Sequence, residues 1–253
     1  EQSSKLYEGR RIWEKFRRNG GTVGQICWQQ SIGRDSDLIL SPAPIHKHHG
    51  GMIQAFYSEP DGLYSALCRK LGQDFDLHRY WGPFASIASS RWIASAASNL
   101  LVSNEATDLL LVYIPHLDYD LQKFGPGSMR IPRAFEEMEM EVEKLFAAAK
   151  LAGYEVLIYG DYAITEAQQP IYPNKILWDA GFLVERNVQG KLYPDIYASR
   201  AFAMVDHQIA HIFLGLARTQ EKNGSRRRRE ILRPYPSIHG PLLRCLVHVF
   251  DNE

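Results

Sequence analysis

The stretch LLLVYIPHLDYDLQKFGP (residues 109–126) joins a strongly apolar run to a group of polar residues. Five of its first six residues are apolar, and Pro115 ends the run. The polar residues that follow, before the turn pair Gly125-Pro126, are His116, Asp118, Asp120 and Gln122. An apolar run that is closed by proline predicts a buried strand. We therefore expect two carboxylates and an imidazole at the carboxyl end of a core strand.

The rest of the chain alternates between similar apolar runs and amphipathic segments. Apolar runs predict strands at 22–28, at the start of 37–52, and at 154–165 and 199–213. Amphipathic or small-residue patterns, several of them ended by glycine, predict helices at 5–19, 60–71, 86–103, 132–152 and 176–180. Strands that alternate with helices predict an α/β fold with a largely parallel sheet.

The composition is that of an ordinary globular protein. Apolar residues make up 45% of the chain, and Lys+Arg and Asp+Glu balance at 29 each. No overall charge therefore favours nucleic acid, and we expect no specific nucleic-acid binding. No apolar run reaches the roughly 18 residues of a membrane helix, so we expect no membrane contact. The cysteines Cys27, Cys68 and Cys245 form no CxxC pair, which favours a reducing compartment and a cytoplasmic location.

The C-terminal part of the chain differs from the rest. Periodicity fades after residue 213, and Arg226–Arg229 form a basic run among polar residues and prolines. Such a run could be an address signal or a nucleic-acid patch, but in a chain of zero net charge a solvated tail is the favoured interpretation. We therefore expect one domain at 1–213 and a poorly ordered basic tail at 214–253.

Polar residues gather where the apolar runs end. In open α/β sheets, ligands bind outside the carboxyl ends of the strands. Three runs bring candidates to that edge, namely Asp118 and Asp120, then Asp161 and Tyr162, then Asp206, His207 and His211. Carboxylate oxygens and imidazole nitrogens suit Zn²⁺ or Mn²⁺. Each acid could instead cap a helix or lie in a turn, and only their convergence favours a metal site.

Two further segments have open interpretations. The loop HKHHGG (46–51) resembles a metal-binding tract in composition, although its spacing fits no defined zinc pattern. Arg79, Arg91 and Trp81 could form a substrate wall, although core packing is the more common role of a tryptophan.

Several blocks of residues 5–213 resemble a known family. The stretches at 109–126, YGDYAIT (159–165) and SRAFAMVDHQIAHIF (199–213) are similar to the type I phosphodiesterase/nucleotide pyrophosphatase branch of the alkaline phosphatase superfamily. The resemblance implies a three-layer α/β/α sandwich with a largely parallel sheet. It also implies a metal-dependent hydrolase of phosphate esters, with one or two divalent ions, commonly Zn²⁺, and a phosphorylated small molecule or nucleotide as substrate.

The resemblance extends to single residues. Asp118 matches the acid that opens the family motif D-x-x-x-H-x-x-G-P, and Gln122 stands in the place of its histidine. Asp161 and Tyr162 match an Asp-His pair, with tyrosine in place of histidine. We expect Asp118 and Asp161 to bind metal, and Gln122 and Tyr162 to orient the substrate or metal-bound water. His207 and His211 are imidazole candidates on chemistry alone.

The resemblance also implies a nucleophile upstream of residue 1, so we expect an incomplete member of the family whose N-terminal part is missing. Two function classes follow. One is a phosphodiesterase/nucleotide pyrophosphatase-like hydrolase that is inactive as this fragment. The other is a catalytically silent module that binds a phosphate ligand or a partner. A relative that acts on sulfate or phosphonate esters is a third, weaker alternative.

The basic tail generates the first prediction. Because its apolar pattern is weak and Arg226–Arg229 repel one another, we expect limited proteolysis to trim the tail before it cuts the domain. Mass spectrometry of the early fragments checks this. Equal protection of the tail and of residues 109–114 would contradict it.

Overall fold

The computed structural model describes residues 4–6, 9–33, 36–48, 51–160, 162–206 and 209–215, and the backbone of residues 246–250. The chain divides into two compact units, Glu1–Ala167 and Gln168–Glu253. Asp161, His207 and residues 216–245 lie outside the described residues. The expected domain boundary at 213 and the expected tail therefore stay predictions.

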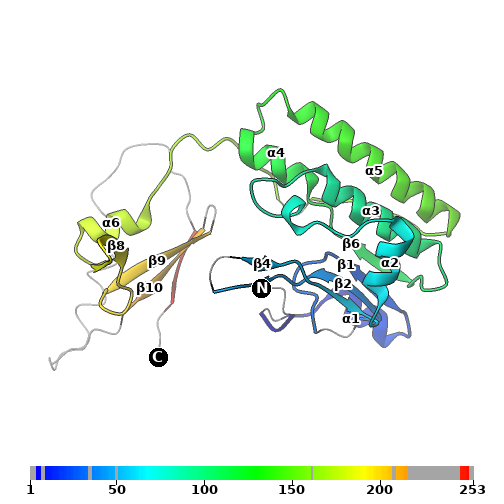
Figure 1. Ribbon diagram of the computed structural model, residues 1–253, viewed down its shortest axis with the longest axis horizontal. Coiled ribbons are helices and arrows are strands. Elements are labelled where there is room, and N and C mark those ends of the chain that lie inside the picture. Colours follow the sequence, from blue (N-terminus) through cyan, green and yellow to red (C-terminus); the bar gives the residue numbers. More distant parts are fainter. Residues whose placement is uncertain are drawn as a thin grey trace. The chain divides into compact units, whose positions relative to one another are not determined.

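A four-stranded sheet forms the centre of the first unit (Figure 1). Its strands, in the order β5-β2-β1-β6, are Phe56–Glu59, Leu38–Pro42, Val23–Ile26 and Leu109–Val112. Strand β1 is parallel to both β2 and β6, and β5 is antiparallel to β2. The predicted α/β class with a mostly parallel sheet is confirmed, whereas the three-layer sandwich stays a prediction.

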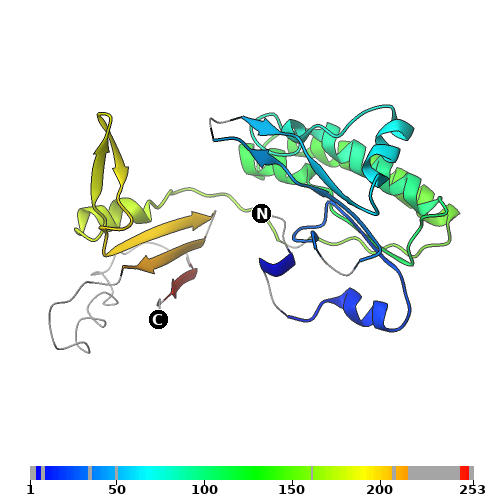
Figure 2. The same cartoon turned by 60° about the horizontal axis from the view of Figure 1, so that its bottom comes forward.

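Helices cover the sheet. Those of the first unit are α1 (Ile12–Arg18), α2 (Leu63–Leu71), α3 (Ile87–Leu101), α4 (His116–Phe124) and α5 (Ile131–Leu151). The unit also contains the 3₁₀ turns η1 (Ser4–Leu6) and η2 (Leu77–Arg79). Strands β3 (Ile45–His46) and β4 (Met52–Ile53) pair with each other as a hairpin. Helices α3 and α5 lie on one side of the sheet and α1 lies on the other (Figures 1 and 2). None of the helices in the described ranges is both long and apolar enough to span a bilayer.

The core lies between the sheet and helices α2 and α3. Ile26 and Leu40 of the sheet are fully buried and belong to one cluster with Trp92 and Ile93 of α3. The predicted small-residue helix at 86–103 is confirmed, and Ala94, Ala96 and Ala97 have no exposed surface. Small side chains allow close approach of a helix to a sheet. Gly24 of β1 makes room for a side chain of the neighbouring strand β6, because a Cβ there would lie 2.7 Å from Leu110 Cδ1.

Two strand predictions are corrected. Residues 154–160 and 162–165 form no strand, and Val156 to Tyr159 are 45–83% exposed. A strand requires backbone pairing as well as apolar composition, and β6 pairs with a neighbour, β1, on one side only. The run at 199–213 contains two antiparallel strands instead of one, β9 (Ala201–Asp206) and β10 (Ile209–Leu214).

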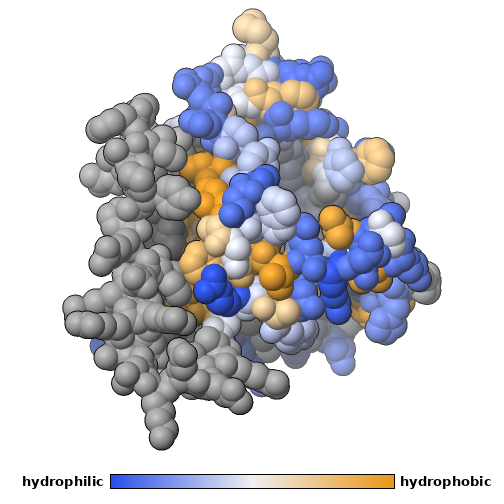
Figure 3. Space-filling view, turned by 90° about the vertical axis from the view of Figure 1, so that its left-hand side faces the viewer, coloured by the Kyte–Doolittle hydropathy of each residue, from blue (hydrophilic) through white to orange (hydrophobic). Residues whose placement is uncertain are grey.

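The second unit contains small sheets with both antiparallel and parallel pairs. It contains α6 (Pro173–Asp179), the hairpin β7 (Glu185–Val188) and β8 (Lys191–Pro194), and a sheet of order β11-β10-β9, with β11 at Leu246–Phe250. The pairs β7–β8 and β9–β10 are antiparallel, and the pair β10–β11 is parallel. Asn174 of α6 donates from Nδ2 to the Ala203 carbonyl, 2.8 Å away, and accepts from the Ala203 amide at 2.7 Å. These two hydrogen bonds satisfy the backbone amide and carbonyl of Ala203 on the outer edge of β9. Apolar side chains lie among charged ones on the outer surface of this unit (Figure 3).

Asp37 ties the amino ends of β1 and β2 to α1. Its Oδ2 accepts from the Val23 amide at 2.8 Å, and its two oxygens accept from the Arg17 guanidinium at 3.0 and 3.2 Å. Partial burial raises the pKa of Asp37, but the hydrogen bonds from Val23 and Arg17 outweigh it and hold the pKa below its usual value. The folded state therefore favours the ionised carboxylate.

This predicts a pH-dependent contribution to stability. A lowered folded pKa gives stability that is complete above the unfolded pKa of about 3.9 and is lost as pH falls through the folded pKa. We expect Asp37→Asn to lower the free energy of unfolding by about 1 kcal/mol near neutral pH, a low value because a third of the side chain is exposed. The difference should shrink below about pH 4.

Urea unfolding curves at neutral and acid pH measure the effect. Glu105→Gln removes an exposed carboxylate near the same sheet edge and serves as the control. An Asp37→Asn deficit that is equally large at acid pH would contradict the assignment.

Candidate functional site

Asp118 accepts two phenol hydrogen bonds on one oxygen. Tyr113 donates to Oδ2 at 3.2 Å and Tyr162 donates to the same atom at 2.5 Å. The other oxygen, Oδ1, has no partner in the described part of the chain. Two donors on Oδ2 fix the rotation of the carboxylate and leave Oδ1 open to a ligand.

The sheet determines where this carboxylate lies. The Tyr113 amide donates to the Ile26 carbonyl at 3.1 Å, which continues the β1–β6 pairing by one residue. Pro115 then precedes α4, and Asp118 lies in the first turn of that helix. An acid in a first helical turn is stabilised by the helix dipole. Asp118 and Asp120, expected at the carboxyl end of a core strand, lie in the helix that follows it, at the carboxyl edge of the sheet.

Buried tyrosines lie beside Asp118. The Tyr119 hydroxyl donates to the Tyr80 carbonyl at 3.0 Å and lies 3.0 Å from Ser89 Oγ. Burial raises the pKa of Tyr80 and of Tyr119 far above the usual value. Both phenols are therefore neutral, and the surroundings of Asp118 contain donors without added negative charge.

Cys27 lies at the end of β1, at the same edge of the sheet. It is 2% exposed, its φ is 53°, and its amide donates to the Leu40 carbonyl at 2.7 Å. Burial raises the pKa of its thiol strongly. Because the thiolate is the nucleophile and the metal ligand, a thiol that stays protonated serves in neither role. Cys27 is a packing residue.

His116 begins α4 and points to α5. Its ring is buried, and Nε2 lies 3.2 Å from Glu137 Oε2. Neither Nδ1 nor Nε2 makes a hydrogen bond of good geometry among the described residues, so the approach of Nε2 to Glu137 is a close polar contact. Desolvation lowers the pKa of His116 below its ordinary value, although Glu137 acts in the opposite direction. A 4% exposed imidazole does not reach a substrate.

The structure brings only some of the predicted site residues together. Asp118 and Tyr162 are in contact, and Gln122 follows Asp118 by four residues on α4, hence on the same helical face. Asp161 and His207 lie outside the described residues. His211 lies in β10 of the other unit, so its convergence with Asp118 stays a prediction.

The other candidates are engaged elsewhere or exposed. Arg91 Nε bonds Glu141 Oε1 at 3.2 Å, so this guanidinium is paired within the α3–α5 contact. Arg79 lies 3.8 Å from Asp76 and its side chain is half exposed. Trp81 is 40% exposed and contacts the ring of Tyr80. In the HKHHGG loop, residues 49 and 50 lie outside the described residues.

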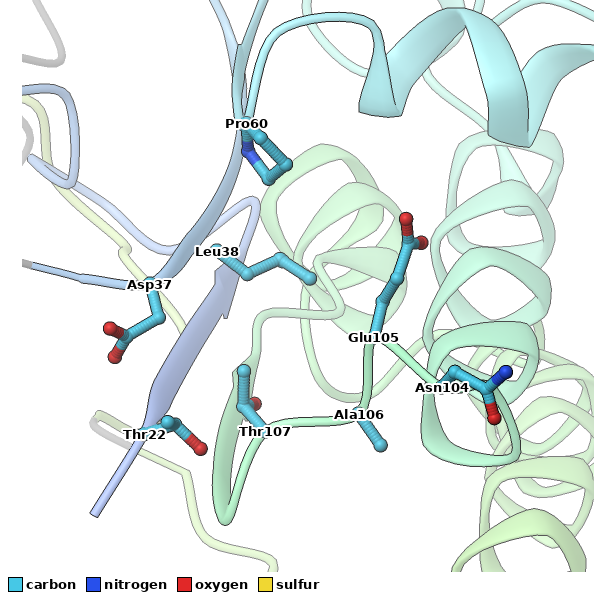
Figure 4. Close-up of a pocket in the computed structure, with 8 residues that line it drawn as sticks. All are labelled: Thr22, Asp37, Leu38, Pro60, Asn104, Glu105, Ala106 and Thr107. Carbon is cyan, nitrogen blue, oxygen red and sulfur yellow. The ribbon is translucent and has the colours of Figure 1, made fainter. Parts of the chain in front are cut away.

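A pocket of about 250 Å³ lies at the opposite, amino edge of the sheet, where Thr22, Leu38 and Thr107 meet (Figure 4). Its Asp37 is already bonded to Arg17 and Val23. The remaining carboxylate, Glu105, lies on an exposed loop. This pocket therefore offers less to a ligand than the open oxygen of Asp118.

Asp118 fits one ligand of a divalent ion. Its Oδ1 is an open, hard carboxylate donor at the edge where α/β sheets bind ligands. Within the part of the chain that the structure describes, no three His, Cys, Asp or Glu side chains gather closely enough to hold a metal. A complete site would need donors beyond these residues.

A comparison with protein families identifies the family of the chain. A model of the type I phosphodiesterase / nucleotide pyrophosphatase family matches residues 1–241. The chain belongs to this family. The resemblance seen in the sequence is confirmed, and with it membership of the alkaline phosphatase superfamily. No curated protein and no solved structure matches the chain.

By the resemblance, an amide, Gln122, and a phenol, Tyr162, would stand where the family motifs have imidazole. This assignment stays a prediction. The Tyr162 phenol donates a hydrogen bond to Asp118, a role that the sequence did not predict. The partnership of His116 with Glu137 was missed as well, because residues 21 positions apart meet only after two helices pack.

The state of the cysteines is directly testable. Burial raises the pKa of Cys27 and of Cys68, whose exposed fractions are 2% and 8%. We expect neither thiol to react with a thiol reagent in the native chain near neutral pH, and both to react after unfolding in urea. Peptide mapping of the labelled chain distinguishes them from Cys245. Rapid native labelling of Cys27 would overturn its assignment as a packing residue.

Proposed function

We propose that this chain is part of a metal-dependent phosphoester hydrolase in which Asp118 binds a divalent ion. The observation that supports the proposal is the open Oδ1 of Asp118 at the carboxyl edge of the sheet, held by two phenols on Oδ2. Family membership supports hydrolysis of phosphodiesters or pyrophosphates, because the family is generally metal-dependent and acts on phosphorylated, nucleotide-like substrates.

Asp161 is the proposed second ligand. It precedes Tyr162 directly in the chain, so one peptide unit, about 3.8 Å between Cα atoms, separates it from a residue that bonds Asp118. Two carboxylates at this edge would suit Zn²⁺, the ion implied by the resemblance, with one or two ions bound. His207 and His211 stay proposed imidazole ligands on their chemistry alone.

Several residues of the chain would then have distinct roles at the site. Tyr113 and Tyr162 hold the Asp118 carboxylate, and Gln122 offers an amide one helical turn further on. The ion, when bound, would polarise a phosphoryl oxygen. Tyr80 and Tyr119 are neutral, so they would not repel a negative charge that develops on the substrate. The three-layer sandwich and the cytoplasmic location belong to the same proposal.

A second function is favoured by one observation. Gln122 and Tyr162 replace imidazoles, and the Tyr162 phenol is already bonded to Asp118. Amide and phenol are weaker ligands than imidazole, so ion binding would be weak and turnover low. The chain would then be a catalytically silent module that binds a phosphorylated ligand.

Metal binding tests the shared part of both functions. We expect isothermal titration with Zn²⁺ or Mn²⁺ to show weak binding, and Asp118→Ala and Asp161→Ala each to weaken it by about tenfold or more. Asp120→Ala, two residues along the same helix and on its opposite face, is the control and should bind as the wild type does. Equal affinity of all three variants would contradict the site.

Restoring the imidazoles separates the two functions. Gln122→His and Tyr162→His should raise metal affinity, since imidazole replaces a poorer ligand. Hydrolysis of bis(p-nitrophenyl) phosphate is measured in parallel. Metal-dependent turnover by the unaltered chain or by either variant supports the hydrolase. Metal binding without turnover in all three chains supports the silent module or a hydrolase that is inactive as this fragment.

A further inference from the structure

A polar contact between α4 and α5 is not used by the proposed chemistry. His116 of α4 and Glu137 of α5 meet at 3.2 Å, with side-chain exposures of 6% and 21%. Glu137 also accepts from Arg133 Nε at 3.1 Å through its other oxygen. Separating a buried imidazole from a neighbouring carboxylate costs free energy, because each polar group would lose its partner where little water can replace it.

Helix α4 depends on such contacts. It has nine residues, and no side chain caps its N-terminus. Isolated helices of this length are marginal in water, so tertiary contacts must hold it. Only residues 113–115 separate it from β6, which fixes where the helix starts but not its rotation about its own axis.

Two side chains of α4 make specific contacts with the surrounding helices and loops. His116 reaches Glu137 of α5, and Tyr119 reaches the Tyr80 carbonyl and Ser89 of α3. The rings of His116 and Tyr119 are 6.1 Å apart in an edge-to-face arrangement. At about 100° per residue, His116 and Tyr119 lie about 60° apart around the helix, and Asp118 lies about 160° from His116 and about 100° from Tyr119.

We propose that the contact between His116 and Glu137 is the anchor that sets the rotation of α4 and thereby places Asp118 against Tyr113 and Tyr162. His116 is a positioning residue in this assignment, and the inference rests on the proposed role of Asp118. Side-chain tips lie about 5 Å from a helix axis, so a rotation of about 20° displaces a carboxylate by about 2 Å. That displacement exceeds the tolerance of a hydrogen bond or a metal ligand.

The chain supplies a matched control one helical turn away. Glu141 of α5 is also buried, at 1% exposure, but it pairs with Arg91 of α3 and with Lys144 of its own helix. Removing Glu141 therefore disturbs a buried charge on the same helix without removing the polar contact to α4, since the partners of Glu141 are Arg91 and Lys144. Comparison of Glu137 and Glu141 variants therefore distinguishes a loss of overall stability from a change in the position of α4.

The experiment uses the full chain with substitutions Glu137→Ala, Glu137→Gln, His116→Ala and Glu141→Ala. Hydrogen exchange of the amides of residues 120–124, without metal, reports on α4. Titration with Mn²⁺ reports on Asp118, and thermal unfolding reports on overall stability. We expect Glu137→Ala and His116→Ala to speed α4 exchange by about tenfold and to weaken Mn²⁺ binding by about tenfold to a hundredfold.

Glu137→Gln, which keeps a polar side chain of the same shape against the imidazole, should stay close to the wild type in both measurements. Glu141→Ala should lower the unfolding temperature but leave α4 exchange and Mn²⁺ affinity unchanged. Equal α4 exchange in Glu137→Ala and Glu141→Ala would overturn the anchor. Absence of Mn²⁺ binding in the wild-type chain would contradict the proposed function instead, and the exchange measurement would still decide the anchor.

Discussion

The parallel pairing of β1 with both β2 and β6 is the constraint on which the rest of the first unit depends. Parallel neighbours end at the same edge of a sheet, so the residues after β1 and after β6 become neighbours there. This pairing extends to the bond from the Tyr113 amide to the Ile26 carbonyl. The pairing therefore brings together Cys27, Tyr113 and the start of α4. Only residues 113–115 join β6 to α4, so Asp118 in the first turn of α4 lies at the same edge.

Burial then decides which groups at that edge are available for chemistry. Cys27, Tyr80 and Tyr119 are withdrawn from water and held in their neutral forms. Asp118 is only partly buried, and phenol donors occupy one of its oxygens while the other stays open among the described residues. The edge thus combines neutral surroundings with one oriented carboxylate. This combination suits an ion or a phosphoryl group better than it suits a protein nucleophile.

The sequence predicts those elements whose signals are local. Helices α3 and α5 follow from apolar periodicity, and Gly72 and Gly153 follow helices α2 and α5 with φ of 71° and 78°, as the glycine stops imply. Val156–Tyr159 were wrongly predicted as a strand, because composition does not reveal whether a pairing partner is present. The hairpin of β7 and β8 was missed, although Gln189 and Gly190, both with positive φ, mark its turn. In the site, Asp118 was found by motif, whereas its phenol partners and the pair of His116 and Glu137 depend on packing between distant segments.

The central claim is that the open oxygen of Asp118 binds a divalent ion at the carboxyl edge of the sheet. Anomalous diffraction at the zinc absorption edge, from crystals of the chain grown with Zn²⁺, tests it most directly. The account predicts an anomalous peak about 2.0–2.2 Å from Asp118 Oδ1 that disappears in Asp118→Asn. A fully occupied peak elsewhere, for example on the histidines of the 46–51 loop, with none at Asp118 would contradict it.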